Sequence, residues 1–392
     1  MKRIGLFLGA SPTHGGVFQY SEAVLEALSG IDHPKLSIVV RYIDPAWIPV
    51  LRGYDVDGRY IPRGSLVRLL DAVLWRIPLP VRLWRHSVAY VHSITRTLAR
   101  DACDLWIFPA QDIWTYLTPA PALGAVHDLM HRYEPSFPEV SALGMYRQRE
   151  RHFRRMGRWA IGILVESVTG RTQLVESYGV DLAKVFVLPY IPSRHVREGS
   201  DETVGVATLP EKFLFYPAQF WEHKNHVRLL HAVAKVRERY PDVRIVFVGS
   251  PKNGYKRVRA EVTALGLEDN VVFLGYVPDA EMPGMYRRAR ALVMPTFFGP
   301  TNIPPLEAFA LGCPVATSRI YGIPEQVGDA ALLFDPLSVD EMAATLERLW
   351  SDDDVCSTLA DRGRARAATW GPEQFAERLA GILAALDGAT RA

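Results

Sequence analysis

The chain has 392 residues, of which 48% are hydrophobic and 22% are charged, and its formal net charge is +2. This is enough apolar sequence for two ordinary domains with buried cores, and the nearly balanced charge does not indicate a nucleic-acid-binding protein. The sequence contains no apolar run of about eighteen residues, which excludes a membrane-spanning helix.

The three cysteines, Cys103, Cys313 and Cys356, lack the paired spacing of a disulfide framework or a metal site. We therefore expect a reduced, cytoplasmic compartment and no bound metal. The apolar run that follows Met1-Lys2-Arg3 is too short for a signal peptide and leads directly into a polar loop. We interpret this run as a first β-strand.

The first half of the chain alternates apolar runs with helical patterns. Residues 4–8 predict a buried strand, 17–28 a helix and 36–43 a second strand, and this order indicates a right-handed βαβ unit in a parallel sheet. Gly15 and Gly16 directly precede the helix, where glycine allows the main chain to approach a ligand closely. A simple tight turn is the alternative. Further strands are expected at 105–108, 123–126, 160–165 and 185–188.

His127 and Asp128 follow the strand at 123–126. In open α/β sheets, ligands bind at the carboxyl ends of the strands. An isolated histidine is more often structural, but the polar turn that follows His127 favours a functional role.

Two basic segments interrupt this half. Residues 59–100 carry eight arginines among leucines and tryptophans, and they form either a membrane-surface segment or a surface helix pair that closes the core. Residues 146–158 predict a basic helix, which is a solvated face or a site for an acceptor or a lipid phosphate. Through Tyr190 the net charge is 22 − 17 = +5, and in the remainder it is 23 − 26 = −3. An anionic membrane would therefore meet the N-terminal half.

Residues 189–211 are rich in proline, glycine and charge, which indicates a domain boundary. The second half repeats the scheme and predicts five parallel strands with helices between them, a second Rossmann-like domain. We expect domains at 1–195 and 196–375, with a terminal helix at 376–392 that packs back toward the N-terminal domain.

Residues 297–308 give the sharpest signal. They join an apolar strand at 291–295 to a short helix, and the free N–H groups of a helix N-terminus attract anions. Pro304 and Pro305 suit a first helical turn because proline has no N–H to leave unpaired. Glu307 follows, where its carboxylate is able to bind two vicinal hydroxyls. A diphosphate on the N–H groups and a ribose on Glu307 would describe a bound nucleotide.

With these motifs the chain resembles the glycosyltransferase family 4 group of GT-B glycosyltransferases over nearly its whole length. The resemblance implies two Rossmann-like domains whose parallel sheets face across a cleft, with the nucleotide held mainly by the C-terminal domain. It also implies retention of the sugar's anomeric configuration and no obligate metal. The residues that carry it are Gly15-Gly16, His127-Asp128, Lys224, Gly275-Tyr276-Val277, Pro304-Pro305-Leu306-Glu307-Ala308, Gly312, Pro314-Val315 and Trp370.

The resemblance also implies roles for single residues. By the resemblance, His127 lies beside the donor sugar. We assign stabilisation of the departing diphosphate to Lys224, the main chain of Gly15-Gly16 and the turn at Thr301-Asn302. The catalytic candidates are therefore His127, Lys224 and Asn302. The substrate-binding candidates are Gly15, Gly16, Asp128, Gln219, Gly249, Tyr276, Val277, Gly299, Pro300, Thr301, Ile303 and Glu307.

Two positions depart from the family's pattern. The family often has two glutamates eight positions apart, and Gly299 stands where the first would be. It commonly pairs an arginine with the lysine of the Lys224 loop, and Gln219 stands at that position. The role of the missing glutamate either passes to the turn at 299–302 or is dispensed with.

The resemblance to polysaccharide-assembly members favours transfer of mannose from GDP-mannose to a glycan or lipid-linked oligosaccharide, at the inner face of the membrane. UDP-glucose or another UDP-hexose is the second choice of donor. The nucleotide sugar is a co-substrate, so no cofactor is expected. The alternatives are a nucleotide-sugar epimerase and a non-catalytic GT-B subunit. A nicotinamide-dependent dehydrogenase is disfavoured because residues 9–16 lack the G-x-G-x-x-G pattern.

Overall fold

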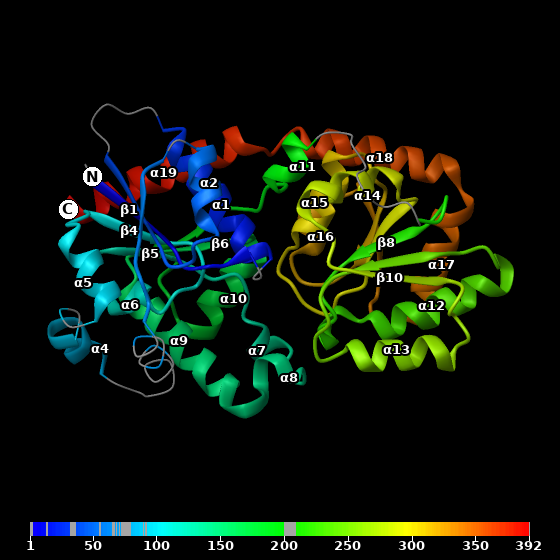
Figure 1. Cartoon of the computed structure of the whole chain (residues 1–392), viewed down its shortest axis with the longest axis horizontal. Coiled ribbons are helices and arrows are strands. Elements are labelled where there is room, and N and C mark those ends of the chain that lie inside the picture. Colours follow the sequence, from blue (N-terminus) through cyan, green and yellow to red (C-terminus); the bar gives the residue numbers. More distant parts are fainter. Residues whose placement is uncertain are drawn as a thin grey trace. The chain divides into compact units, whose positions relative to one another are not determined.

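The computed structural model describes residues 3–12, 15–31, 37–54, 56–64, 67, 69, 71, 80–88, 90, 92–199 and 209–391. The chain divides into two compact units (Figure 1). Unit 1 comprises residues 1–129, 143–190 and 372–392, and unit 2 comprises residues 130–142 and 191–371. The segment 130–142, which the sequence analysis assigned to the N-terminal domain, therefore belongs to unit 2.

Unit 1 is built on a parallel sheet of seven strands in the order β3-β2-β1-β4-β5-β6-β7. The sequence analysis identified six of these strands. It missed β3, which has only three residues at the edge of the sheet and largely exposed side chains, so it gives no apolar run. The strands are β1 (Arg3–Leu8), β2 (Ser37–Tyr42), β3 (Gly58–Tyr60), β4 (Leu105–Phe108), β5 (Ala122–Ala125), β6 (Gly162–Val165) and β7 (Val185–Val187).

Helices cover both faces of this sheet (Figure 1). The C-terminal α19 packs against α1, where the ring of Phe375 meets Tyr20 edge-on at 6.0 Å. The principal helices of unit 1 are α1 (Gly16–Ser29), α2 (Trp47–Gly53), α4 (Val81–Leu83), α5 (Ser93–Arg100), α6 (Trp114–Leu117), α9 (Met145–Trp159), α10 (Val168–Tyr178) and α19 (Pro372–Arg391). The expected basic helix at 146–158 is α9. Much of the basic segment 59–100 lies outside the described residues.

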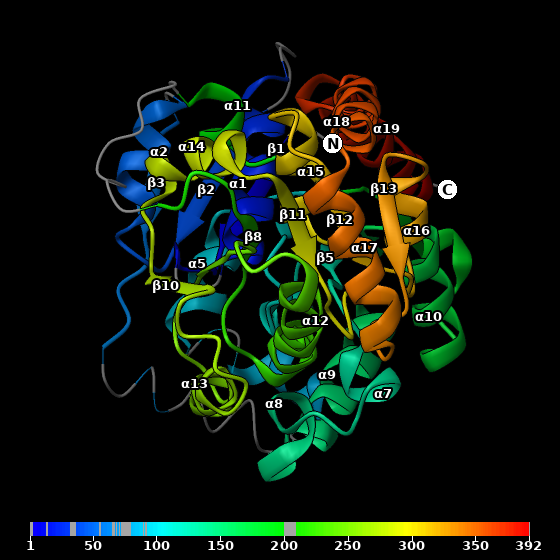
Figure 2. The same ribbon diagram turned by 90° about the vertical axis from the view of Figure 1, so that its right-hand side faces the viewer.

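Unit 2 is built on a second parallel sheet, in the order β10-β9-β8-β11-β12-β13. The predicted count of five strands is wrong, because the sheet has six; the apolar run at 331–334 forms the last of them and pairs in parallel with β12. Figure 2 views this unit from another side. The strands are β8 (Leu214–Pro217), β9 (Ile245–Val248), β10 (Val271–Gly275), β11 (Ala291–Met294), β12 (Val315–Ser318) and β13 (Ala331–Phe334).

Alternate residues of each strand in unit 2 pack into two cores. Leu214 and Tyr216 of β8 point toward the core beneath α12, α13 and α17, whereas Phe215 points toward the core beneath α14, α15 and α16. This alternation is the normal consequence of a pleated strand that is buried on both faces. The helices of unit 2 are α7 (Met130–Tyr133), α8 (Pro138–Ser141), α11 (Arg194–Glu198), α12 (His226–Arg239), α13 (Tyr255–Ala264), α14 (Met282–Arg288), α15 (Ile303–Ala310), α16 (Ile323–Val327), α17 (Val339–Ser351) and α18 (Asp353–Ala367).

The strand orders determine where each unit can bind a ligand. In both sheets the first strand of the unit lies inside the sheet, and the next strands along the chain add first to one side of it and then to the other. The crevice at the carboxyl ends of the strands on either side of such a switch point is the usual ligand site of an open α/β sheet. In unit 1 this crevice lies after β1 and β4, and in unit 2 it lies after β8 and β11. In the described residues no helix is long and apolar enough to cross a membrane.

Candidate active site

The turn after β11 is the centre of the candidate site in unit 2. As predicted, α15 follows this turn and has proline in its first turn. Thr301 Oγ1 and Asn302 Nδ2 are buried, and neither has a hydrogen-bond partner among the described residues. A buried polar atom without a partner costs about 1–3 kcal/mol. These two atoms therefore favour a polar ligand at the N-terminus of α15.

Gln326 of α16 fixes the main chain of Asn302 from both sides. The Asn302 N–H donates to Gln326 Oε1 at 3.0 Å, and Gln326 Nε2 donates to the Asn302 carbonyl at 2.6 Å. The sequence analysis did not single out Gln326, because it lies 24 residues from Asn302 and has no motif of its own. Its contact leaves the Asn302 side-chain amide available to a ligand.

Glu307 lies on α15 and is buried. Its Oε1 accepts a hydrogen bond from the Ser193 hydroxyl, and its Oε2 accepts one from the Tyr286 hydroxyl at 2.6 Å. His195 Nε2 is 3.9 Å from Oε1. Burial, and then the charge of Glu307, raises the pKa of Tyr286 well above its ordinary value, so this phenol stays a donor. The carboxylate thus binds two hydroxyls, the type of group that a ribose offers. Its predicted role in ribose binding stays a prediction.

Gly299 has a backbone that suits no other residue. Its φ is +139°, and a Cβ added there would lie 2.7 Å from Asn302 Nδ2. The position where family members often have a glutamate is therefore filled in this chain by the side chain of Asn302.

We expect Gly299→Glu to lower activity rather than restore a lost function. The strained φ should destabilise the protein by about 1–3 kcal/mol, and the displaced Asn302 should slow transfer about tenfold or more. Thermal unfolding and initial rates measure both effects. Gly381→Ala is the matched control, because its Cβ would meet no neighbouring atom. A Gly299→Glu protein that is more active than the wild type would contradict this interpretation.

Lys224 ends a short 3₁₀ turn after β8, at Glu222–Lys224. The Lys224 carbonyl accepts from the Tyr216 hydroxyl at 2.8 Å. Asn225, with a φ of +59°, donates from Nδ2 to the carbonyls of Pro295 and Pro336, both at 2.9 Å. These anchors hold the Lys224 loop beside the residues that follow β11.

The other loop candidates of unit 2 lie at the ends of β8, β9 and β10. Gln219 Oε1 accepts from Trp221 Nε1 at 2.9 Å. A Cβ on Gly249 would lie 2.3 Å from the carbonyl of Ala218, so only glycine fits there. The Gly249 N–H donates to the Gly275 carbonyl at 2.7 Å. In the adjoining loop, Tyr276 is 72% exposed and Val277 is buried. The predicted role of Tyr276 and Val277 in substrate binding stays a prediction.

In unit 1, Gly15 caps the N-terminus of α1 with φ +56° and ψ −121°, and Gly16 is the first residue of that helix. No atom would lie within 4 Å of a Cβ on Gly15. Among the described residues, the open space beside Gly15 and the lack of a side-chain cap on α1 agree with the expected ligand approach, which no observation tests directly.

Both ring nitrogens of His127 are engaged within unit 1. Nδ1 pairs with the Glu166 carboxylate, and Nε2 lies 2.7 Å from the Pro109 carbonyl. Burial alone would lower the pKa of His127, but the charge and hydrogen bond of Glu166 outweigh it and raise the pKa. We therefore interpret the ring as an imidazolium that donates to two oxygens. Its expected place beside the donor sugar stays a prediction.

Two carboxyl groups, those of Asp128 and Asp112, lie near His127 in the crevice of unit 1. Asp128 pairs with Arg149 of α9, so its predicted substrate contact would compete with an ion pair. Asp112 follows β4 and packs against Gly9, where a Cβ would lie 2.3 Å from Asp112 Oδ1. Burial raises the pKa of Asp112 to about 7, against the lowering effect of nearby Arg63 and His127. The sequence analysis missed Asp112, although its place at a strand end was visible.

The segment 130–142 makes hydrogen bonds to the loops of unit 2 that carry His223 and Asn253. Glu139 Oε1 accepts from the His223 N–H at 3.2 Å and lies 2.6 Å from His223 Nδ1, and Oε2 accepts from Asn253 Nδ2 at 2.8 Å. Burial would raise the pKa of Glu139, but these donors outweigh it and lower the pKa to about 2. Glu139 therefore positions His223, the residue directly before Lys224.

We expect Glu139→Gln to destabilise unit 2 by about 1.5 kcal/mol, the lower range for a hydrogen bond to a charged group. Because folding depresses this pKa from 4.5 to about 2, the contribution is present above pH 4.5 and is lost as the pH falls toward 2. Denaturant unfolding of both proteins at several pH values measures it. Glu198→Gln, in the exposed pair with Arg194, is the control and should change little. A difference between wild type and Glu139→Gln that grows on acidification would contradict the assignment.

No group of three or more His, Cys, Asp or Glu side chains is placed to hold a metal ion within the described part of the chain. The fold and the site together define a protein of two Rossmann-like units, with an anion-attracting helix N-terminus and a buried hydroxyl-binding carboxylate in the second. This is a doubly wound α/β architecture, in which ligands bind at the carboxyl ends of the strands.

Comparisons with known proteins narrow this class. Residues 202–366 match the family model "Glycosyl transferases group 1". The O-antigen chain mannosyltransferase B of Escherichia coli is 41% identical over 95 residues, which cover 24% of this chain and 25% of that protein. The MMP alpha-(1->4)-mannosyltransferase of Mycolicibacterium hassiacum is 34% identical over 37% of this chain and 35% of its own. A D-inositol 3-phosphate glycosyltransferase of Pseudarthrobacter chlorophenolicus is 27% identical over 89% of this chain and 80% of its own.

The fold has close counterparts among solved structures. Anabaena Alr3699/HepE, in complex with UDP and glucose, superposes with a TM-score of 0.70 and 20% identity over 98% of this chain and 100% of that one. WaaG, a glycosyltransferase involved in lipopolysaccharide biosynthesis, superposes with a TM-score of 0.67 and 16% identity over 97% of this chain and 99% of that one. These superpositions confirm the predicted GT-B fold, and the matches of residues 202–366 and of the curated relatives confirm the resemblance to glycosyltransferases. The chain spans only 25% and 35% of the lengths of the first two curated relatives.

Proposed function

We propose that this protein is a retaining, metal-independent hexosyltransferase that moves a sugar from a nucleoside diphosphate to a glycan or lipid-linked oligosaccharide. The observation that carries the proposal is the turn before α15, where Thr301 Oγ1 and Asn302 Nδ2 are buried without partners beside an anion-attracting helix N-terminus. The match of residues 202–366 to the group 1 glycosyl transferases supports it.

The chemistry proposed for unit 2 is stabilisation of a leaving diphosphate. As the bond between the sugar and the phosphate breaks, negative charge develops on the phosphate oxygen, and the sugar carbon acquires cationic character. Fixed donors in a site that excludes water stabilise such charge well. Lys224, the first N–H groups of α15 and the Asn302 amide supply these donors. The leaving phosphate oxygen then accepts the proton of the acceptor hydroxyl, which attacks from the same face, so no side chain serves as nucleophile.

The favoured donor is GDP-mannose, and a UDP-hexose is the second candidate. Several similar proteins are mannosyltransferases, including O-antigen chain mannosyltransferase B. The second candidate has its own support, because the similar HepE structures contain UDP, glucose or UDP-glucose.

A thermal-shift panel of GDP, UDP, dTDP and ADP sugars tests the donor. We expect GDP-mannose to raise the unfolding temperature most, and a larger shift with a UDP-hexose would reverse the order of the two candidates. No shift with any of the four nucleotides would count against a nucleotide-sugar protein of either kind.

A non-catalytic sugar-nucleotide-binding subunit is the second candidate function. Gly299 and Gln219 favour it, since they stand where the family has an acid and an arginine. Release of nucleoside diphosphate by the pure protein distinguishes the two: a subunit binds the nucleotide sugar without cleaving it. Release that persists in EDTA would support the metal-independent reaction.

The acceptor is proposed to be bound at a membrane surface, at the inner face of the membrane in the cytoplasm. The basic face of α9 and the excess of Arg and Lys before Tyr190 support contact with anionic lipid. The protein should sediment with anionic vesicles and be released by salt. Equal recovery with neutral vesicles would remove this part of the proposal.

A further inference from the structure

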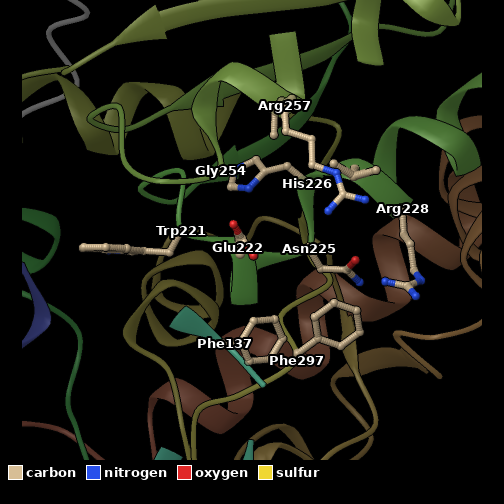
Figure 3. A pocket seen from close by; sticks show the side chains of 11 residues that line it. Phe137, Trp221, Glu222, Asn225, His226, Arg228, Gly254, Arg257 and Phe297 are labelled. Carbon is tan, nitrogen blue, oxygen red and sulfur yellow. The ribbon is translucent and has the colours of Figure 1, made fainter. Parts of the chain in front are cut away.

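Unit 2 contains a pocket that the proposed function does not use (Figure 3). Its volume is about 110 Å³, and it lies where α12 and α13 begin. Neither Lys224 nor any residue of the turn at 299–302 lines it. In Figure 3 Arg257 lies above the pocket, the rings of Phe137 and Phe297 lie below it, and Arg228 lies at the right beside Phe297.

Both helices that begin at this pocket have an arginine and no acidic residue in the first turn. A helix N-terminus favours acidic residues and disfavours cations. The first turns of α12 and α13 contain no acidic residue and no side-chain cap, and each places an arginine at its third position, Arg228 and Arg257. Two N-termini and two guanidinium groups therefore concentrate positive charge that an anion would neutralise. The exposed Glu222 is the one acid among the lining residues.

His226, the first residue of α12, points independently to a polar ligand. It lines the pocket and is only 2% exposed, and neither ring nitrogen has a hydrogen-bond partner of normal geometry among the described residues. Burial, aided by Lys224 and His223, lowers its pKa to about 3, against a smaller raising effect of the Ala218 main chain. The neutral ring keeps one N–H to donate. It stacks on Phe220 at 4.5 Å, which holds its orientation.

The rings of Phe137 and Phe297 form an aromatic wall that orients Arg228 and offers an apolar surface. Phe137 and Phe297 stack with their centroids 5.7 Å apart, and the Arg228 guanidinium lies 5.1 Å above the Phe297 ring. A cation–π contact of this kind fixes a guanidinium while leaving its N–H groups available. The volume of the pocket accommodates one tetrahedral oxyanion and the first atoms of its carrier.

We propose that this pocket binds the phosphate group of a phosphate ester, with Arg228, Arg257 and His226 as donors and the apolar part of the ester against Phe137 and Phe297. The phosphate belongs either to a soluble ester or to a lipid headgroup. The pocket is separate from the residues proposed to hold the donor diphosphate, so a protein without transferase activity would still bind phosphate here.

Calorimetric titration with inorganic phosphate and with glycerol phosphate, at constant ionic strength set with chloride, tests the proposal. Arg257→Gln and Arg228→Gln should each weaken binding at least tenfold, and His226→Phe should weaken it while preserving the aromatic packing. Arg259→Gln is the matched control on α13, since that side chain lies over Phe273 outside the pocket. It should bind phosphate like the wild type.

Vesicles of phosphatidylcholine with and without phosphatidic acid distinguish the source of the phosphate. Loss of phosphatidic acid binding in Arg257→Gln, with no response to soluble phosphate, would assign the pocket to a lipid headgroup. Equal phosphate binding by the wild type, Arg228→Gln and Arg257→Gln would overturn the proposal. Loss of binding in Lys224→Ala alone would also overturn it, because the phosphate would then occupy the donor site.

Discussion

Lys224→Ala is expected to slow sugar transfer about 100- to 1,000-fold, the usual effect of removing one preorganised donor to a developing negative charge. Folding should be retained, because the Lys224 carbonyl that accepts from Tyr216 and the two hydrogen bonds that Asn225 Nδ2 donates stay in place. The expected signature is a fall in kcat with a circular dichroism spectrum and an unfolding temperature close to those of the wild type.

Lys256→Ala is the control for this variant. It removes an exposed lysine from α13 that has no proposed role in transfer. Its rate should equal that of the wild type. Near-normal transfer by Lys224→Ala would remove the assignment of Lys224 to the diphosphate.

Glu307→Gln is expected to weaken nucleotide binding about 10- to 100-fold, the range for losing a hydrogen bond to a charged acceptor. The amide fills the same volume but replaces one acceptor oxygen by a donor, which would face the hydroxyl of either Ser193 or Tyr286. Calorimetric titration with the preferred nucleotide measures the loss. The change should appear in the affinity for the nucleotide more than in the rate at saturation.

Two variants separate ribose binding from a purely structural role of Glu307. Glu238→Gln changes an exposed glutamate of α12 and should leave affinity and stability unchanged. Ser193→Ala removes a hydroxyl that a bound ribose would replace, so it should lower stability without lowering affinity for the nucleotide. An unchanged affinity in Glu307→Gln would exclude Glu307 as a ribose ligand.

The fold was largely predictable because its signals are local. Apolar runs separated by glycine and proline identified the main strands of both sheets, and Pro304 and Pro305 identified the start of α15. β3 was missed because three half-exposed edge residues carry no apolar run. The count of strands in unit 2 was wrong by one, although the sixth strand, at 331–334, is itself a recognisable apolar run.

The candidate site was less predictable, since its partners are far apart in sequence. Glu166 pairs with His127 across 39 residues, and Glu139 reaches His223 across 84. Neither pair forms a motif. The sequence therefore indicated a histidine at a strand end but not the carboxylate that pairs with it. The segment 130–142 likewise belongs to unit 2 through contacts with residues far along the chain, which its local composition does not reveal.

At Gly299 the sequence and the structure give complementary information. The sequence indicated only that an acid common in the family is absent. The backbone at φ +139° and the Asn302 amide beside it explain how the position is filled. The unpartnered Thr301 and Asn302 atoms then make the same turn the best-supported ligand contact of unit 2.

Release of nucleoside diphosphate from GDP-mannose and from UDP-glucose by the purified protein tests the central claim most directly. Our account predicts release from at least one of these sugars, with GDP-mannose preferred. It also predicts that release continues in EDTA and falls about 100-fold or more in Lys224→Ala. Tight nucleotide-sugar binding without release, in the presence of glycan and lipid-linked acceptors, would contradict it.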